Sequence, residues 1–436
     1  MNRKITIAAP VRTLSGYGAR SRDFITTLIE LGYDVDILAI PWGDTPNTGL
    51  DLDNPNHKAI HERIIPQLTY KPDIWIQCTI PPEFQQVGQY NIGLTAGIET
   101  TLCKPEWIEG CNRMDLIITS SDHSKKVFES SQFEKRQGNS EVPVEIVNLK
   151  TPVEVLFEGI DTNIFKKKQC NSNVINTFMQ DVTEDFAFLF VGHWLQGDLG
   201  ADRKDIGMLI HTFYTTFKRK APQNRPALIL KTSHANFSNL ELHSIQNKIQ
   251  KIGEMVKEQG GVNGDLPSVY ILHGELSDLE MNALYNHNKI KAMVSFTKGE
   301  GFGRPLLEFT AVGKPVIASG WSGQLDFLSP EYSYILPGQV VQVHPSAVNN
   351  WIIQEGGWFT VNYTYAAQIL ESIYKSYDKF LDKSKKHINI TKNNFSLDAM
   401  KDRISMIFSK LNEYKDIRST MQPTMETFKI PERIQQ

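Results

Sequence analysis

The sequence predicts an α/β protein of two doubly wound domains, each built on a parallel sheet. Short apolar runs alternate with amphipathic stretches along most of the chain, which is the pattern of βαβ units. The 436 residues are too many for one ordinary core and suit two domains. Between about residues 160 and 182 the apolar runs give way to lysines, asparagines and serines. We interpret this stretch as the linker between the domains.

The first domain is expected to comprise residues 1–165. An apolar strand over 4–9 opens it, and a glycine-bearing loop at 15–18 leads into a helix over about 20–31. Further short apolar runs predict strands at 33–38, 73–78, 91–95 and 116–120. A polar cap at 121–124 then opens a helix, because serine and aspartate side chains satisfy free N–H groups there.

The second domain is expected to comprise residues 166–395. Its apolar runs predict strands at 186–191, 227–231, 269–273, 292–296 and 315–318, and the chain reads as helical from about Tyr365. We expect residues 396–436 to form a C-terminal helix and tail that pack back on the first domain. Ligands of open α/β sheets collect at the carboxyl ends of the strands, so the cleft between the domains is the expected site.

Composition restricts the function classes. Residues 1–165 hold 15 Lys+Arg against 22 Asp+Glu, a net charge of −7, which disfavours a nucleic-acid backbone as partner there. The N-terminal apolar run is too short and too polar for a signal peptide, and the absence of any run of ~18 apolar residues predicts no integral membrane segment. A cytoplasmic setting follows as the default, since no CxxC spacing joins the cysteines Cys78, Cys103, Cys111 and Cys170.

The most informative stretch is residues 295–328. It leaves a strand through a loop with three glycines over 299–303 and enters a helix expected over about 305–312. Glycines let a backbone approach a ligand closely, and a helix N-terminus offers N–H groups to an anion such as a pyrophosphate. Glu300 lies in the loop, and Glu308 follows eight residues later, about one turn into the helix. Both carboxylates are therefore expected at the cleft.

This spacing, with Gly-Phe-Gly after the first glutamate, closely resembles the retaining glycosyltransferases of family 4 (glycosyl transferases group 1), which have the GT-B fold. Further similar segments occur in the same order along the chain: the glycine loop at 15–18, Glu-Gly-Ile-Asp-Thr-Asn-Ile-Phe at 158–165, Arg-Lys-Asp-Ile-Gly at 203–207 and His-Gly-Glu-Leu at 273–276. The resemblance implies two Rossmann-like domains facing a cleft, with the C-terminal helix returning to the first.

The resemblance also implies roles on the donor side. Glu308 would accept hydrogen bonds from the ribose hydroxyls of a nucleotide-sugar donor, and Glu300 would contact the transferred sugar. Lys204, with Arg203 beside it, would neutralise the departing diphosphate, whose charge grows in the transition state. An ordinary solvated helix start is the alternative for these two cations. The remaining donor contacts would come from backbone at Gly301, Phe302, Gly303, Gly16, Gly18 and Gly274.

Two positions depart from the family pattern. His193 stands where a strand end usually presents an arginine to the phosphate, and Arg304 stands where an apolar residue usually follows Gly-Phe-Gly. We hypothesise that Arg304 supplies the missing positive charge. On the acceptor side, Glu99 follows an apparent strand and His123 lies at the start of a helix. Roles as a loop carboxylate and a helix-cap residue are the alternatives.

The sequence thus predicts transfer of a hexose or pentose from a nucleotide sugar to an acceptor hydroxyl, with retention of configuration. No cofactor or metal is expected, because such enzymes usually act without a metal and no Asp-x-Asp pair lies in a metal-binding context. A saccharide or glycolipid is the family's common acceptor, and a nucleic-acid base or a protein stays open. An inactive nucleotide-sugar-binding protein and a nucleotide-sugar epimerase also remain compatible with the sequence.

Overall fold

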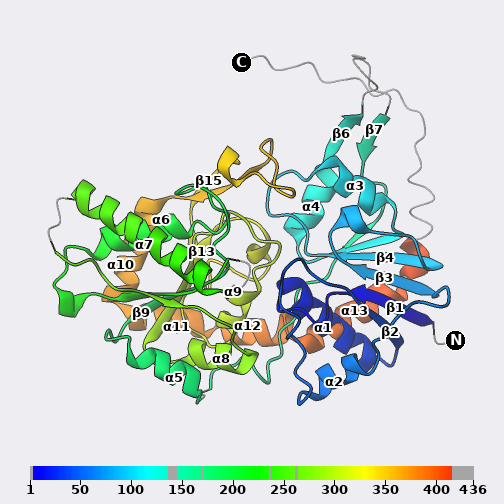
Figure 1. The fold of residues 1–436 in the computed structure, drawn as a ribbon, viewed down its shortest axis with the longest axis horizontal. Coiled ribbons are helices and arrows are strands. Elements are labelled where there is room, and N and C mark those ends of the chain that lie inside the picture. The colour runs from blue at the N-terminus through cyan, green and yellow to red at the C-terminus, as the bar shows by residue number, and fades with distance from the viewer. Residues whose placement is uncertain (1–2, 136–144, 169–170, 235–236, 261–263, 415–436) are drawn as a thin grey trace.

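The computed structural model describes residues 3–135, 145–168, 171–234, 237–260 and 264–414. Within these residues, two six-stranded parallel sheets form two lobes, each flanked by helices (Figure 1). The predicted fold class, two doubly wound α/β domains, is confirmed. No helix of the described residues is long and apolar enough to cross a membrane.

The first sheet carries helices on both faces. Its strand order is β2 (Asp34–Ala39), β1 (Lys4–Ala9), β3 (Ile74–Cys78), β4 (Tyr90–Thr95), β5 (Leu116–Thr119) and β8 (Val153–Val155). The helices of this lobe are α1 (Gly16–Glu30), α2 (Pro55–His61), η1 (Pro81–Glu83), α3 (Pro105–Asn112) and α4 (Asp122–Ser130). A small antiparallel pair, β6 (Gln132–Lys135) and β7 (Glu145–Asn148), projects from the lobe in Figure 1.

The second sheet has the strand order typical of dinucleotide-binding folds. That order is β11 (Val269–Leu272), β10 (Ala227–Lys231), β9 (Ala187–Val191), β12 (Ile290–Ser295), β13 (Val316–Ser319) and β14 (Tyr334–Leu336). Around it lie α5 (Asn173–Gln180), α6 (Ile206–Phe217), η2 (Pro222–Asn224), α7 (Asn239–Gly260), α8 (Asp278–Asn286), α9 (Arg304–Thr310), η3 (Gly323–Asp326), the hairpin β15 (Gly338–Gln342) and β16 (Gly357–Val361), η4 (Pro345–Ala347), α10 (Tyr363–Lys375), α11 (Tyr377–Lys385) and α12 (His387–Asn394).

The central strand β9 shows why its sequence is continuously apolar. Successive side chains of a strand point to opposite faces, and both faces of this sheet are covered. Phe188 and Phe190 pack under α6, α7 and α10, whereas Leu189 packs under α5, α8 and α9. All three side chains are fully buried, so the run at 186–191 could be identified as a strand from composition alone.

The C-terminal helix α13 (Leu397–Ser409) returns to the first domain, as predicted (Figure 1). Met400, Ile404 and Ile407 lie in the same buried cluster as the side chains of β1 and α1. Close to the crossing, Ile160 pairs with Ser396 in an isolated parallel bridge, which joins the outgoing and returning chains. The domain boundaries after residues 165 and 395 stay predictions.

Two predicted features of the chain are wrong. Residues 16–18 are not a loop but the first turn of α1, because the Ser15 hydroxyl caps the helix by accepting from the Gly18 N–H at 2.9 Å. The interpreted linker is partly ordered as α5, whose Ile175 and Met179 are buried in the second domain. Cys170 and the tail beyond residue 414 lie outside the described residues.

Candidate functional site

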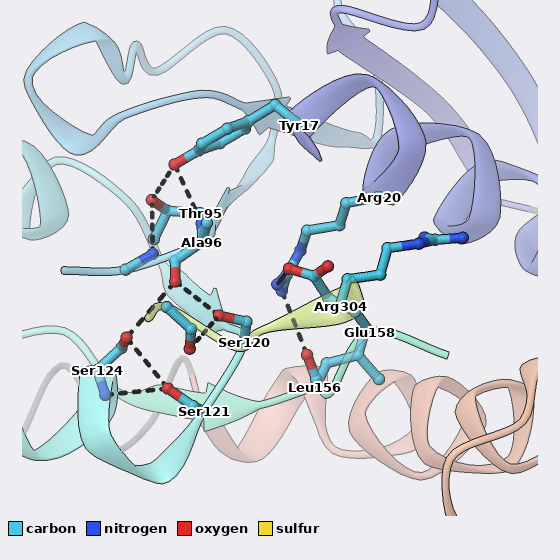
Figure 2. A network of polar contacts seen from close by, with 12 residues as sticks. Tyr17, Arg20, Thr95, Ala96, Ser120, Ser121, Ser124, Leu156, Glu158 and Arg304 are labelled. Carbon is cyan, nitrogen blue, oxygen red and sulfur yellow. Dashed lines mark hydrogen bonds and ion pairs between the residues drawn. The ribbon is translucent and has the colours of Figure 1, made fainter. Parts of the chain in front are cut away.

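The loops that leave the two sheets meet at the carboxyl ends of their strands. Ser120, directly after β5, donates its hydroxyl to the carbonyl of Ala96 at 2.6 Å and is 3.0 Å from that of Gly301 (Figure 2). Farther along the interface, the Thr101 N–H donates to the Gly357 carbonyl at 2.8 Å. The loop with the three glycines therefore rests directly against the first domain.

Two of these glycines serve this contact between the domains. A Cβ atom on Gly299 would overlap the carbonyl oxygen of Glu99, and one on Gly301 would lie 2.5 Å from that of Ala96. We expected glycines here for close approach to a ligand. The structure gives them another reason, since any larger residue would hold the domains apart.

The rest of the loop joins the core. The Phe302 ring lies 5.1 Å from that of Phe327 and is buried, so this residue offers only its backbone to a ligand. Gly303 has a φ of 96°, a conformation that L side chains rarely adopt, and it begins α9. Helix α9 has only seven residues, and its N-terminus alone does not indicate an anion site.

Glu300 is the centre of a buried ion cluster. One of its carboxylate oxygens pairs with the ammonium of Lys204, and the other lies 3.4 Å from Nη1 of Arg203. The same Nη1 lies 3.4 Å from Oε1 of Glu99 in the first domain. Glu300 is only 7% exposed. The structure therefore brings together four residues that the sequence singled out, Glu99, Arg203, Lys204 and Glu300.

The charges of this cluster favour the ionised forms of Glu300 and Arg203, whereas burial lowers the pKa of Lys204 despite its pairing with Glu300. Burial raises the pKa of Glu300, but Lys204 and Arg203 outweigh burial and hold the pKa below its ordinary value. Burial lowers the pKa of Arg203, and Glu99 and Glu300 more than compensate. Glu300 therefore stays ionised at neutral pH and keeps two cations in fixed positions.

A second buried pair supports the cluster from behind. Lys298 Nζ lies 3.3 Å from Oδ2 of Asp205, which also accepts from the hydroxyl of Tyr363 at 2.6 Å. The Lys298 N–H donates to the Arg203 carbonyl at 2.7 Å, so the two loops are joined through backbone as well. Asp205 has a φ of 53°, unusual for a residue with a side chain. Sequence reasoning missed both charges, although Asp205 follows Lys204 directly and Lys298 lies two residues before Glu300.

His193 lies in the field of these cations. Its Nδ1 is 3.0 Å from the Ser233 hydroxyl, and burial, followed by Lys204 and Arg203, lowers its pKa to about 4. The imidazole is therefore neutral at physiological pH and supplies no permanent charge where the family usually has an arginine. Nearby, Lys231 donates to the carbonyl of Gly274 at 2.7 Å, which fixes the loop expected beside the donor base.

Glu308 lies in a second polar centre. Its Oε2 accepts from the Tyr285 hydroxyl at 2.9 Å, and its Oε1 accepts from Nε of Arg304 at 2.9 Å. Burial raises the pKa of Glu308 to about 7, against the opposing effect of Arg304. Glu308, 7% exposed as a whole residue, changes its charge near neutral pH. Tyr285 comes from α8, and nothing in the sequence indicated its part in the site.

Arg304 connects this centre to the first domain. Its Nη1 pairs with the carboxylate of Asp23 on α1, and in Figure 2 its side chain extends towards that helix. The contacts of Arg304 are thus with Asp23 and Glu308, which lends no support to our hypothesis that it replaces the arginine missing at His193. Asp23 lies in the middle of α1, and no pattern in the sequence indicated that it would contact the site.

The remaining candidates lie on the first-domain side. A Cβ atom on Gly16 would meet open space, whereas Gly18 packs against the Thr13 backbone. His123 is the second residue of α4, and its ring lies 4.6 Å from that of Trp321 in the second domain. Burial lowers its pKa to about 4. Tyr17, between the two glycines, has its hydroxyl 3.0 Å from that of Thr95 (Figure 2).

Among the residues that the structure describes, no group of three or more His, Cys, Asp or Glu side chains is arranged to hold a metal ion. The cationic side chains described at the site include Arg203, Lys204 and Arg304.

Comparisons with known proteins identify the fold. No family model matches the sequence, and no curated protein matches it. Solved structures do match over 94% of this chain. A glycosyltransferase from Rickettsia africae aligns at 13% identity with a TM-score of 0.60 over 99% of its own length. The sucrose-phosphate synthase of Thermosynechococcus elongatus aligns at 14% identity with a TM-score of 0.58 over 99% of its length. HepE from Anabaena, in complex with UDP-glucose, aligns at 15% identity with a TM-score of 0.56 over its full length. At these identities the likeness establishes the GT-B fold.

Proposed function

We propose that this protein is a glycosyltransferase that moves a sugar from a nucleotide sugar to an acceptor hydroxyl, with retention of configuration. The observation that carries the proposal is the gathering of Glu300, Lys204 and Arg203 at the meeting point of two Rossmann-like domains, with Glu308 in the same segment. The GT-B neighbours named as glycosyltransferase, sucrose-phosphate synthase and a UDP-glucose complex add support.

In the proposed reaction the donor diphosphate lies against Lys204 and Arg203. Both cations are already fixed by Glu300, so little reorganisation is needed as negative charge grows on the leaving group. An ammonium has three donors, so Lys204 can hold a phosphate oxygen and Glu300 at once. These cations are proposed to take the charge-stabilising role without a metal or cofactor. Glu300 then contacts the transferred sugar, as in the enzymes that the motif resembles.

Glu308 is proposed to accept hydrogen bonds from the ribose hydroxyls of the donor. Each carboxylate oxygen has two lone-pair sites, so the bonds from Tyr285 and Arg304 leave room for a ligand. Glu300 and Glu308 are each only 7% exposed, so a donor reaches them when the domains move apart. Closure afterwards excludes water and limits wasteful hydrolysis.

The acceptor is proposed to approach from the first domain, past Glu99 and His123. A saccharide or glycolipid is the favoured class, by analogy with the family that the motifs resemble. The net charge of −7 over residues 1–165 disfavours a nucleic acid. The nucleotide sugar that binds will identify the transferred sugar as a hexose or a pentose.

A thermal-shift panel of UDP-, GDP-, ADP- and CDP-sugars on wild type and Glu308→Ala tests the proposal. A ligand at ~100 times its Kd stabilises the fold by roughly 2.7 kcal/mol. We expect one donor to stabilise the wild type and the variant to lose that response. Release of nucleoside diphosphate in the presence of acceptor, with the anomer of the product read by NMR, then tests transfer and retention. If no nucleotide sugar shifts the wild type, the proposed function is wrong. Binding without nucleotide release indicates a binding protein.

A further inference from the structure

Arg304 makes two charged contacts that belong to different domains. Its Nε donates to Glu308 within α9 at 2.9 Å, and its Nη1 pairs with Asp23 on α1, 281 residues away in sequence. All three side chains are largely buried, with 13% exposure for Arg304, 20% for Asp23 and 10% for Glu308. One guanidinium therefore joins the proposed ribose-binding carboxylate to the opposite domain.

The chemistry of arginine suits this bridge. The guanidinium presents its five donors in a rigid fork, so contacts at Nε and Nη1 are made in fixed relative directions. Glu308 holds the Nε side, and Asp23 determines where the Nη1 side points. Asp278, at the start of α8, adds to the negative field around Arg304, which holds the pKa of Arg304 well above its ordinary value. Arg304 remains charged whether the domains are together or apart.

Separation of the domains breaks only one of the two contacts. Arg304 and Glu308 lie four residues apart on one helix and stay together, whereas Asp23 moves with the first domain. Without Asp23, the guanidinium of Arg304 can reorient. The Glu308 carboxylate, which is bound to Arg304, can then reorient as well. The geometry of Glu308 would then differ between separated and closed domains.

We propose that Arg304 is a positioning residue that couples donor binding to domain closure: through its ion pair with Asp23, closure orients Glu308 for the donor ribose. The inference rests on the proposed function and adds to it a residue of the opposite domain, Asp23, which affects donor affinity without contacting the donor. Coupling between a ligand and a conformational change is reciprocal, so a bound donor favours closure by the same factor.

Asp23→Asn is the decisive variant, because asparagine keeps the shape of aspartate and removes its charge. Asp326→Asn is the matched control, since Asp326 also spans the interface by accepting from the Asp122 N–H at 2.9 Å, a bond that involves neither Arg304 nor Glu308. The Kd values of UDP-glucose, GDP-mannose, ADP-glucose and CDP-glucose are measured by calorimetry. Small-angle X-ray scattering reports the donor-induced compaction. Thermal unfolding verifies that each variant is folded.

We expect Asp23→Asn to weaken binding of the active donor by about fivefold or more, at the lower end of typical coupling, and to reduce compaction. Asp326→Asn is expected to stay within about twofold. Arg304→Met should weaken binding further, and the double variant should show less than the sum of the two effects, since both remove one bridge. If Asp23→Glu restores the donor affinity, the charge contact with Arg304 is responsible, and not a purely structural role of Asp23.

The outcomes separate this inference from the proposed function. If the wild type binds none of the four nucleotide sugars, both fail. If Glu308→Gln loses donor binding while Asp23→Asn retains it, the function stands and the coupling is wrong. Equal effects of Asp23→Asn and Asp326→Asn would also overturn the coupling, because the loss would then reflect general weakening of the interface.

Discussion

Glu300 and Glu308 lie eight residues apart in one loop-helix segment, and each is 7% exposed, yet their surroundings differ. Glu300 faces two cations, Lys204 and Arg203, which keep its pKa below the ordinary value despite burial. Glu308 shares one cation, Arg304, with Asp23, and its pKa rises to about 7. The same residue type in the same short segment is a permanent charge in one place and a titratable group in the other.

The difference follows from what the neighbouring segments contribute. The loop before α6 brings two adjacent cations to Glu300, and the carboxylate of Glu99 balances part of their charge. Around Glu308, α8 brings the neutral phenol of Tyr285, and Asp278 adds an unfavourable negative charge. A site that must hold a departing diphosphate needs fixed cations, whereas a site for neutral ribose hydroxyls does not.

Glu300→Gln should have the largest effect on transfer activity, because Glu300 is the permanently charged member of the two glutamates. The substitution removes the ion pair of Lys204 and one of the two ion pairs of Arg203, which keeps its pair with Glu99, and it removes the proposed contact with the transferred sugar. We expect transfer to fall by about 10²–10³-fold, as for loss of one preorganised transition-state contact. Steady-state kcat is the measurement, with Glu254→Gln on the exposed face of α7 as control. Retention of more than a tenth of the activity would show that Glu300 lies outside the chemistry.

Gly299→Ala should act on the same centre through backbone alone. The new Cβ would overlap the Glu99 carbonyl, so the domains must separate or the loop must shift. A displacement on the order of 1 Å at a reacting centre costs about 10²-fold in rate. We expect a loss of this size in kcat, with a larger radius of gyration in solution. Gly264→Ala, where a Cβ meets open space, is the control. Unchanged activity in Gly299→Ala would mean that this close contact is not needed for turnover.

The fold was predictable where burial dictates composition. Continuous apolar runs identified β9, β10 and β13, because strands covered on both faces have little room for polar residues. The start of α1 was not predictable in this way, since Gly16 and Gly18 are poor helix residues, and only the close packing of Gly18 against Thr13 explains a glycine there. Helix α5 was missed because only two of its side chains, Ile175 and Met179, are buried.

Most of the candidate site that could be predicted lies within motifs, and Glu99 was singled out by its place after a predicted strand. The spacing of Glu300 and Glu308 and the adjacent pair Arg203 and Lys204 are local in sequence. Asp23 reaches its partner Arg304 from 281 residues away, and Asp205 is 93 residues from Lys298. Such pairs depend on how the domains and loops are placed in space, and a single sequence carries no periodic or spacing signal for them.

A pH series sharpens the contrast between the two glutamates. Burial, opposed by Arg304, puts the pKa of Glu308 at about 7, and the neutral acid is a poorer acceptor for ribose hydroxyls. Donor affinity should therefore fall about tenfold per pH unit below pH ~7, measured by calorimetry between pH 5 and 8.5. Glu300, whose pKa is lowered, stays charged across this range. Asp326 and Lys231 have pKa values of about 6 and about 8, so Glu308→Gln is needed to identify the group. In Glu308→Gln we expect weak donor binding with no such slope, and a slope that survives in the residual affinity would assign the titration to another group.

The free energy of unfolding without ligand should depend on pH in the opposite direction to donor affinity. The folded pKa of Glu308 is raised above the ordinary 4.5, so its contribution is fully present below pH 4.5 and is lost as the pH rises through about 7. The whole shift corresponds to about 3 kcal/mol. Compared with Glu308→Gln, the wild type should therefore lose more free energy of unfolding between pH 5 and pH 8. Chemical denaturation at these two pH values provides the measurement. Parallel curves for the two proteins would indicate that Glu308 is ionised throughout.

Glu99→Gln should have the smallest effect. Its carboxylate lies 3.4 Å from Arg203 and is 29% exposed, so solvent screens the pair, and such pairs contribute about 1 kcal/mol or less. Arg203 also keeps its bonds to Glu300 and to the Gly299 carbonyl, so the cation stays in place. We expect kcat to change by less than about fivefold. A rise in the KM of the acceptor with an unchanged KM of the donor would support the acceptor-side role. If the KM of the donor rises instead, Glu99 acts through Arg203, and the ion cluster around Glu300 extends functionally into the first domain.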